Sequence, residues 1–364
     1  MGAVNLALPR VQSTLGRRAA EAPPRRPCSF GREVLFPEPS YPTPLRRLDE
    51  LSHASAQVWL KDDGQTHAAY GGNKVRQVSA LVRDAAERGA RRVLTFGAAG
   101  SHHVLTTALF ARAQGLGCAA VLMPQPKSEH AVNTLRAALA AGLDAAPAVP
   151  TLRAPLAFVQ AFRAGDALIA PGGFGPLGAA AYAEAFAELA AQFRAAGEGS
   201  PDCVVVPLGT GVTAAGLLAG VAFAGLSTTI VGVSVLENPL SALMVRGLGA
   251  AVVAQRGREQ ACAQRGRLRV ERGFVGAGYG ARTVAGDAAL ARAAELGVEL
   301  DPTYTAKAFA CVLELVERLR GTRRARPLRI VYWHTLSAVS LDALLVGAPS
   351  FAELPRRLRR LFVE

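Results

Sequence analysis

The fold is decided by residues 204–234, which read VVVPLGTGVTAAGLLAGVAFAGLSTTIVGVS. A β-branched apolar run predicts a buried strand, two closely spaced glycines predict a turn, and an alanine- and leucine-rich run predicts a helix before a second strand. These predicted elements occupy residues 204–206, 209–213, 214–224 and 229–234. The uncharged stretch 204–226 is long enough to span a bilayer, but its internal glycine turn favours the strand, turn and helix interpretation.

The same unit occurs earlier in the chain. Short apolar runs predict buried strands, and each is followed by a stretch with apolar residues at helical spacing. The predicted strands cover residues 58–61, 92–96 and 118–123, and the predicted helices begin at Lys74, after a Ser101 cap, and at Glu129. Residues 145–155, rich in alanine and proline, are predicted to be loop. Strands that alternate with helices indicate parallel sheets covered on both faces, so we expect an α/β fold with two sheet domains.

The composition indicates an ordered globular chain of about two domains, because 50% of its 364 residues are hydrophobic and only 19% are charged. The formal net charge of +13 suggests nucleic-acid binding as a function class. The arginines are dispersed, however, and no aromatic residues interleave with their local clusters to form a base-stacking platform. We therefore expect a solvated basic surface, with neither nucleic acid nor a membrane as a partner.

The cysteines point to a reducing compartment. They are odd in number, widely spaced and free of any CxxC or Cys/His cluster, so a disulfide framework and a metal site are both disfavoured, and we expect a cytoplasmic protein. Residues 1–27 carry arginines with almost no acids, and we interpret them as a disordered leader. The five cysteines are Cys28, Cys118, Cys203, Cys262 and Cys311.

Lysine is scarce, with four residues among 41 basic ones. One of them lies in the segment Tyr70-Gly-Gly-Asn-Lys-Val-Arg76, where two glycines permit close backbone approach to a ligand and Lys74 begins a predicted helix. The helix dipole and burial would both disfavour the ammonium form, which is what a Schiff-base lysine requires. A surface lysine after a turn explains this segment alone equally well.

The segment Gly209-Thr-Gly-Val-Thr213 lies between a predicted strand and a predicted helix, where backbone N–H groups can converge on a phosphate. The absence of a following Gly-Lys-Ser/Thr excludes a P-loop. The segment also resembles half of a dinucleotide fingerprint, and Glu237 stands near the distance at which NAD sites place an acidic residue. Spacing alone therefore leaves both cofactors open.

Eight short motifs occur together in one order along the chain. This series resembles the fold type II pyridoxal phosphate (PLP) enzymes of the tryptophan synthase β-like superfamily, and specifically the D-cysteine desulfhydrase and 1-aminocyclopropane-1-carboxylate (ACC) deaminase family. The resemblance implies PLP as cofactor and two open, twisted, mainly parallel sheet domains with helices on both faces. The motifs are Lys61-Asp-Asp63, Gly71-Gly-Asn-Lys74, Ser101-His-His103, Gly172-Gly-Phe-Gly-Pro-Leu-Gly178, Gly209-Thr-Gly-Val-Thr213, Gly278-Tyr-Gly280, Asp301-Pro-Thr-Tyr304 and His334-Thr335.

The resemblance also implies roles for single residues. Lys74 would hold PLP as a Schiff base and remove the substrate's Cα proton, and Tyr279 and Tyr304 match the family's active-site tyrosines. The residues expected to bind the cofactor are Asn73, Lys74, His102, Thr335, which would meet the pyridine nitrogen, and the phosphate cup of Gly209, Thr210, Gly211, Val212 and Thr213. The residues expected to bind the substrate are Ser101, His102 and His103.

The same resemblance implies a domain division and a homodimer. The large, PLP-binding domain would comprise residues 28–76 and 181–364, and the small domain would comprise residues 77–180. Lys61 and the neighbouring aspartates are expected to stabilise the site region through ion pairs, and Lys307 is expected to be structural.

The implied reaction is desulfhydrase-like α,β-elimination, in which a small amino acid gives a 2-keto acid and ammonia, plus sulfide from cysteine. A neutral hydroxyl at Thr335 makes a weaker electron sink than a carboxylate partner would, and residue 305 is not the acid that follows the tyrosine in ACC deaminases. Two alternatives remain open: an ACC deaminase-like ring opening, and a PLP-binding homologue with impaired catalysis. The second is motivated by departures from the family pattern at His102, Val212 and Leu336.

Overall fold

The computed structural model describes residues 37–255 and 267–363, and its larger sheet has six strands. Neighbouring strands are parallel, except that the edge strand β1 is antiparallel to β2. A mainly parallel sheet was predicted, and it is confirmed. In spatial order the strands are β1 (Leu45–Arg47), β2 (Ala56–Asp62), β11 (Leu328–His334), β8 (Cys203–Leu208), β9 (Thr229–Ser234) and β10 (Leu268–Glu271).

A second sheet has four strands, all parallel, and a short pair of strands lies apart from both sheets. The second sheet contains two of the predicted strands, 92–96 and 118–123, at its centre. In spatial order its strands are β6 (Leu143–Pro147), β4 (Gly117–Met123), β3 (Arg92–Ala98) and β7 (Asp166–Leu168), and the separate pair is β5 (Gln125–Pro126) with β12 (Phe362–Val363).

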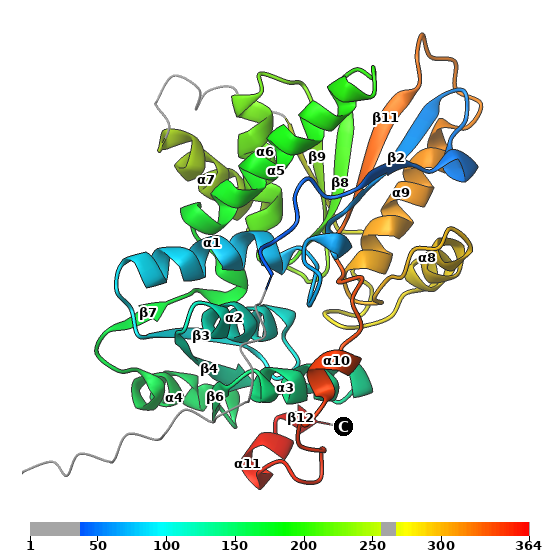
Figure 1. Cartoon of the computed structure of the whole chain (residues 1–364). Coiled ribbons are helices and arrows are strands. Elements are labelled where there is room, and N and C mark those ends of the chain that lie inside the picture. The colour runs from blue at the N-terminus through cyan, green and yellow to red at the C-terminus, as the bar shows by residue number, and fades with distance from the viewer. Residues whose placement is uncertain (1–36, 256–266, 364) are drawn as a thin grey trace, which may run out of the picture. The chain divides into compact units, whose positions relative to one another are not determined.

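Helices cover both faces of the larger sheet (Figure 1). Along β8, Val204 and Val206 pack in one apolar cluster with α5, α6 and α7, whereas Val205 packs in another with α8 and α9. This alternation shows why a run of β-branched residues is apolar without a break: both faces of the strand are buried. The helices named here are α5 (Pro176–Ala195), α6 (Val212–Phe223), α7 (Ser241–Ala254), α8 (Val284–Glu295) and α9 (Thr305–Leu319).

The helix α6 is buried on all sides because small residues let α5 approach it closely. A Cβ added at Gly216 would lie 2.0 Å from the Ala179 carbonyl oxygen, and one at Gly220 would lie 2.5 Å from Phe186 Cβ. With 12 residues, α6 is about 18 Å long, which is shorter than a bilayer core. In the described parts of the chain, we find no helix with the length and hydropathy that a membrane crossing requires.

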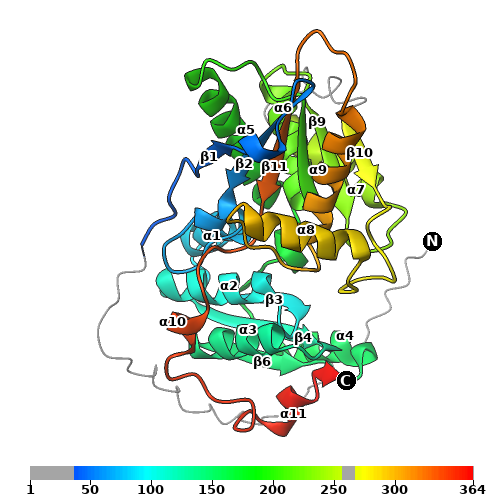
Figure 2. The ribbon, with the colours of Figure 1, turned by 90° about the vertical axis from the view of Figure 1, so that its right-hand side faces the viewer.

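The smaller sheet packs against α1, α2 and α3 on one face and α4 on the other. Leu354, Leu358 and Phe362 join the first of these clusters, so the chain end after α10 runs beside the smaller sheet (Figure 2). α1 contacts both α2 and α5, and so connects elements of the two sheets. These helices are α1 (Lys74–Glu87), α2 (His102–Ala113), α3 (Glu129–Ala140), α4 (Ala154–Ala161), α10 (Asp342–Leu345) and α11 (Arg356–Arg359).

The prediction of loop for residues 145–155 is wrong. These residues include the end of β6, a short 3-10 turn at Thr151–Arg153 and the start of α4. β6 is an edge strand, so Pro147 at its end does not interrupt a ladder on both sides, and small alanines fit beneath α4. Tertiary pairing with β4 therefore overrides the local preference for loop.

Candidate active site

The loop before α1 is locked to the end of β11 by backbone contacts. The amide of Asn73 donates to the Thr335 carbonyl at 3.1 Å, and the amide of Gly72 donates to the Asp63 carbonyl at 2.8 Å. A Cβ added at Gly71 would lie 1.8 Å from the Gly64 carbonyl oxygen, and Gly72 has φ +96°. Both glycines are therefore required by the backbone itself, which fixes the position of Lys74.

We expect Gly71→Ala to lower the free energy of unfolding by about 1–3 kcal/mol, because the added methyl group overpacks a rigid backbone contact. The measurement is the midpoint of urea unfolding. Gly247→Ala is the matched control, since nothing lies within 4 Å of its added Cβ and the residue is exposed in α7. Equal midpoints for the two variants would contradict the contact at Gly71.

Lys74 is the first residue of α1, and its side chain is half-buried. Burial lowers the pKa of its amine from 10.5 to about 8. The residue before Lys74 contacts the glycine cup, because Asn73 Nδ2 donates to Thr213 Oγ1 at 3.3 Å. Lys74 thus has the two properties that a Schiff-base lysine needs: an amine that is readily neutral and a position next to a candidate phosphate site.

This depressed pKa gives a pH prediction for cofactor capture. At pH 8 about half of the Lys74 amine is neutral, whereas an ordinary lysine with a pKa of 10.5 is only about 0.3% neutral. We expect the rate at which cofactor-free protein captures PLP to rise with pH up to about 8 and then level off. Borohydride reduction followed by peptide mass spectrometry measures it, with exposed Lys127 as the internal control. Capture at Lys74 that keeps rising toward pH 10 would contradict the prediction.

The predicted phosphate cup is the loop between β8 and α6. Gly211 is the N-cap of α6 in the left-handed conformation, with φ +88°. The first backbone bond of the helix runs from Ala215 N–H to Gly211 O at 2.9 Å, so the amides of residues 212–214 precede it and are available to an anion. The side chain of Val212 is 1% exposed and packs in the core with α5 and α7, so it leaves the cup open.

A second glycine loop lies against this cup. Gly172 has φ +65°, and a Cβ added there would lie 2.8 Å from the side chain of Thr210. The Gly172 carbonyl accepts a hydrogen bond from Gln77 Nε2 of α1. The motif at residues 172–178 thus connects the cup to the helix that begins at Lys74.

The two predicted tyrosines form a pair beside the cup. Their hydroxyl oxygens lie 2.8 Å apart, and their rings pack edge to face at 5.9 Å. A Cβ added at Gly209 would lie 3.4 Å from Tyr304 Cε1. Lys307 Nζ donates to the Val275 carbonyl at 2.7 Å, close to the loop that carries Tyr279, in agreement with the expected structural role of Lys307. The pair is Tyr279 and Tyr304.

The start of α9 is stabilised by Asp301. Its carboxylate accepts from the amides of Thr303 and Tyr304 at 2.9 and 2.7 Å and from Thr305 Oγ1 at 2.6 Å. The Tyr304 side chain is therefore not needed to start α9. Burial raises the pKa of Tyr304 well above its ordinary value, and its phenol stays protonated.

The predicted substrate residues begin α2. Ser101 is the N-cap in extended conformation, but its hydroxyl makes no capping bond, in contrast to the predicted cap. Both ring nitrogens of His102 are engaged: Nδ1 with the Tyr70 hydroxyl and Nε2 with His130 Nε2 at 2.9 Å. His102 can donate to a cofactor oxygen only by exchanging one of these partners.

His103 is 3% exposed, and its Nε2 lies 2.9 Å from Thr95 Oγ1. Thr95 donates its hydroxyl hydrogen to the Ile169 carbonyl, so His103 Nε2–H must be the donor to Thr95. Its Nδ1 is then a buried acceptor, and within the described residues it has no partner. Burial and the nearby Lys74 charge lower the pKa of His103 to about 3. The ring is therefore neutral, and its Nδ1 can accept a hydrogen bond from a bound ligand.

Buried ion pairs beneath α1 hold this region in place, as predicted for Lys61 and its neighbours. Asp63 Oδ1 pairs with Arg76 Nη2 at 2.8 Å, and Asp63 Oδ2 accepts from Trp333 Nε1 at 2.7 Å. Lys61 and Arg76 both pair with Glu188 of α5. The prediction of a structural ion-pair role is confirmed.

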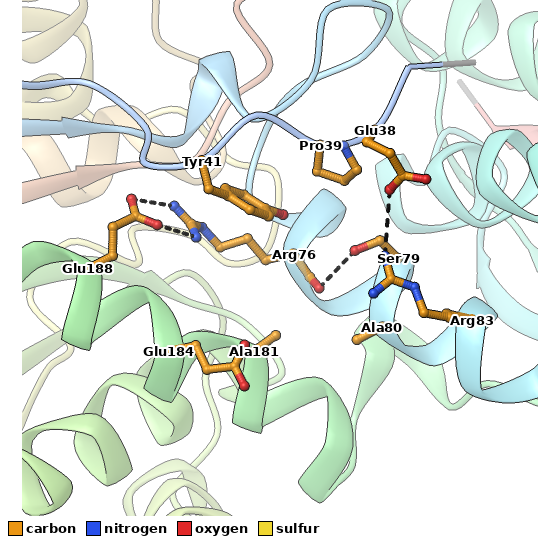
Figure 3. A pocket seen from close by; sticks show the side chains of 10 residues that line it. All are labelled: Glu38, Pro39, Tyr41, Arg76, Ser79, Ala80, Arg83, Ala181, Glu184 and Glu188. Atoms are coloured by element: carbon orange, nitrogen blue, oxygen red, sulfur yellow. Dashed lines mark hydrogen bonds and ion pairs between the residues drawn. The ribbon is translucent and has the colours of Figure 1, made fainter. Parts of the chain in front are cut away.

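A pocket of about 370 Å³ opens on the outer side of these pairs (Figure 3). Arg76 lies there beneath the ring of Tyr41, at 4.4 Å from its centroid, and reaches Glu188. None of the predicted site residues lines this pocket. The pocket is therefore separate from the predicted cofactor site.

The last predicted cofactor residue, Thr335, is half-buried and follows β11 directly. The preceding His334 is fixed by Asp62 Oδ1 on Nδ1 and by the Glu299 carbonyl on Nε2, both at 2.9 Å.

Cys118, Cys203 and Cys311 are free and buried, and Cys28 and Cys262, like the predicted leader 1–27, lie outside the described residues. In residues 37–255 and 267–363, no group of three or more His, Cys, Asp or Glu could hold a metal ion.

These observations fit PLP on three counts. An amine of lowered pKa lies at a helix start, unpaired helix amides form an anion cradle, and a buried ring nitrogen lacks a partner. Lys74 would hold the cofactor, the predicted cup of residues 209–213 with the first amides of α6 would hold its phosphate, and Thr335 would face its ring. The chemistry of this donor set matches an aldehyde and a phosphate on one molecule.

Comparison with known proteins supports this assignment of the site. The chain is 32% identical over 315 residues to nocardicin C-9' epimerase of Nocardia uniformis subsp. tsuyamanensis, covering 81% of this chain and 90% of that protein. It is 32% identical over 318 residues to D-cysteine desulfhydrase of Klebsiella pneumoniae (strain 342), covering 83% and 93%. The crystal structure of an ACC deaminase homologue matches with a TM-score of 0.66 and 26% identity, over 87% of this chain and 96% of that one.

A family model described as pyridoxal-phosphate dependent enzyme matches residues 38–335. That range includes Lys74, the glycine cup and Thr335. The cofactor, the enzyme class and the fold predicted from the motifs are thereby confirmed. The chain belongs to the family of pyridoxal-phosphate dependent enzymes.

Proposed function

We propose that this enzyme catalyses α,β-elimination on a small amino acid with a good β-leaving group, and that D-cysteine gives a 2-keto acid, ammonia and sulfide. The observation that carries the proposal is the phenol pair beside the glycine cup, with its hydroxyls 2.8 Å apart. Because Tyr304 stays protonated, it can donate to a departing thiolate. The relationship to D-cysteine desulfhydrases supports the same reaction.

Each residue would have a separate task. Bound PLP supplies an electron sink that makes the Cα proton of an amino acid removable. The neutral amine of Lys74 would hold the cofactor and then accept that proton. The first-turn amides of α2 and the hydroxyl of Ser101 would bind the substrate carboxylate, since a helix start favours an anion. His103 Nδ1 would accept a hydrogen bond from the bound ligand.

Elimination is favoured over ring opening by the residue after Tyr304. ACC deaminase-like chemistry would use an acid there, whereas this chain has Thr305. Its hydroxyl is already bound to Asp301 Oδ2 at 2.6 Å, as part of the start of α9. No free acid therefore stands next to the phenol pair at this position.

The test is a substrate panel on PLP-loaded protein. Keto-acid release is measured for D-cysteine, L-cysteine, D-serine and ACC, and chiral chromatography follows each recovered amino acid. D-Cysteine should be the best substrate, because sulfide leaves more readily than hydroxide. Activity on ACC alone would replace the proposal by ring opening, change of configuration without keto acid would indicate epimerisation, and a yellow protein inert to all four would indicate a PLP-binding homologue.

We also infer a homodimer in the cytoplasm, with the large domain formed by residues 28–76 and 181–364 and the small domain by 77–180. The three buried free cysteines support a reducing compartment. The separate apolar clusters of the two sheets support two sheet domains, while Leu354, Leu358 and Phe362 pack with the smaller sheet although the division assigns them to the large domain. Light scattering coupled to size-exclusion chromatography measures the oligomer, and limited proteolysis measures the division.

A further inference from the structure

Three polar side chains from separate segments form one hydrogen-bonded chain near Lys74. The hydroxyl of Tyr70 contacts His102 Nδ1, and His102 Nε2 lies 2.9 Å from His130 Nε2. The rings of Tyr70 and His102 are nearly parallel, at 17°, and those of His102 and His130 are 4.9 Å apart. Tyr70 is 1% exposed, whereas His130 in the first turn of α3 is exposed. The chain therefore runs from the interior to solvent.

The positions of the hydrogens follow from simple constraints. Burial raises the pKa of Tyr70, which keeps its phenol protonated, and burial together with the charge of His130 lowers the pKa of His102 to about 4. A neutral imidazole has one donor and one acceptor nitrogen. If Tyr70 donates to Nδ1, then His102 Nε2–H must donate to His130, whose own Nδ1–H remains for solvent.

We propose that His130 is a further residue of the active site, and that it carries protons between solvent and the His102–Tyr70 pair near Lys74. The proposal rests on the proposed function, because that reaction removes one proton from Cα and delivers another to a leaving group. His130 is neither part of the predicted motifs nor close to them in sequence.

The transfer is balanced at every step. When a proton reaches the Tyr70 oxygen from the reacting side, the phenol hydrogen moves to His102 Nδ1. The Nε2 hydrogen of His102 moves to His130 Nε2, and the Nδ1 hydrogen of His130 leaves to water. Each group gains one proton and loses one, so none changes its net charge, and the reverse sequence delivers one proton inward, so a proton taken in one half of the reaction is returned in the other.

The charges around His102 suit it to transmit a proton and not to store one. Three groups act on it besides Tyr70: His130 from α3 and Lys74 from α1 lower its pKa, and Asp301 from the turn before α9 raises it. Burial is the largest influence, and the net effect holds the imidazole neutral. A ring that stays neutral can switch its hydrogen between two nitrogens at each passage.

Two variants of His130 separate proton transfer from mere positioning. In His130→Gln the amide oxygen can still accept from His102 Nε2–H, which preserves the tautomer of His102, but an amide cannot pass a proton on. In His130→Ala the removed ring leaves room for added imidazole. His53→Gln is the control, because the His53 ring bonds the Val316 carbonyl through Nε2 and the Ser55 amide through Nδ1, outside the predicted site.

The experiment uses the PLP-loaded full chain and D-cysteine. We expect kcat to fall about 10²-fold in His130→Gln and His130→Ala, as for loss of one proton-transfer group, with KM and PLP absorbance unchanged. Added imidazole should raise kcat of the alanine variant about tenfold and should leave kcat of the glutamine variant unchanged. In ¹⁵N spectra, His102 should carry its hydrogen on Nε2 in the wild-type protein and in His130→Gln.

Wild-type kcat in His130→Gln would overturn the proposal, and so would the lack of imidazole rescue in His130→Ala. If the wild-type protein releases no keto acid, the proposed function fails, and the ¹⁵N spectra still decide the inference. In that case the inference about His130 is wrong if His102 carries its hydrogen on Nδ1, or if the His102 signals are the same in wild-type and His130→Ala protein.

Discussion

Lys74→Ala is expected to remove the visible absorbance of bound PLP and to lower kcat by about 10³-fold or more. The substitution deletes both the amine that would anchor the cofactor and the base that would take the Cα proton, and a positioned base alone is worth about 10²–10⁴. The fold should survive, because Lys74 is only half-buried and the helix start is set by backbone bonds of its neighbours. Absorbance spectra and keto-acid release measure the effect.

The matched control is Lys127→Ala. Lys127 is exposed and stacks on the ring of Phe351 at 4.8 Å, so its loss should change neither absorbance nor turnover. A Lys74→Ala protein that still binds PLP with a visible absorbance would show that another amine holds the cofactor. Lys61 and Lys307 would then be the candidates, although their amines are committed to Glu188 and to the Val275 carbonyl.

Those two lysines also show the limit of reasoning from composition. The scarcity of lysine draws attention to each of the four residues, and three of the four lie wholly or partly in the interior. Two of the three, however, have amines that are hydrogen-bonded within the protein, Lys61 to Glu188 and Lys307 to the Val275 carbonyl. Scarcity separates interior lysines from surface ones, and only the ordered motifs single out Lys74.

The alternation of apolar strands and helices could be predicted because it depends on short-range periodicity. Residues 145–155 were mispredicted because the pairing of β6 with β4 depends on contacts that local composition does not contain. The effect of Val212 on the phosphate cup, which departs there from the family pattern, could not be predicted for a local reason. Its side chain points into the core because α6 begins at that residue, and the direction of a Cβ at a helix start follows only from the exact register.

His130 could not be found from the sequence for a related reason. It lies 28 residues from His102, on another helix, and a lone histidine at a helix start carries no signal of its own. The one available clue is that His102 begins the helix after β3 and that His130 lies in the first turn of the next helix after β4, and β3 and β4 are neighbours in one sheet, with the short β5 between β4 and α3. In parallel sheets such positions meet at one edge, which is where ligands bind in α/β folds.

Asp63→Ala is expected to be the most destabilising single substitution near the site, with a loss of about 3–5 kcal/mol in the free energy of unfolding. Asp63 is fully buried, and its removal leaves the Arg76 guanidinium without one of its two carboxylates and the Trp333 N–H without an acceptor. Unfolding entropy is about 0.75 kcal/mol/K for a chain of this length, so Tm should fall by roughly 4–7 °C.

Asp49→Ala is the control, since Asp49 pairs with Arg47 on the surface and such pairs contribute about 0–1 kcal/mol. Arg76→Met in the Asp63→Ala background tests the cause. If an uncompensated charge produces the loss, removing that charge should recover part of it, and the two effects should be strongly non-additive. Additive losses would place the cost instead in the unpaired Trp333 and Tyr182 groups, both of which donate to Asp63 Oδ2.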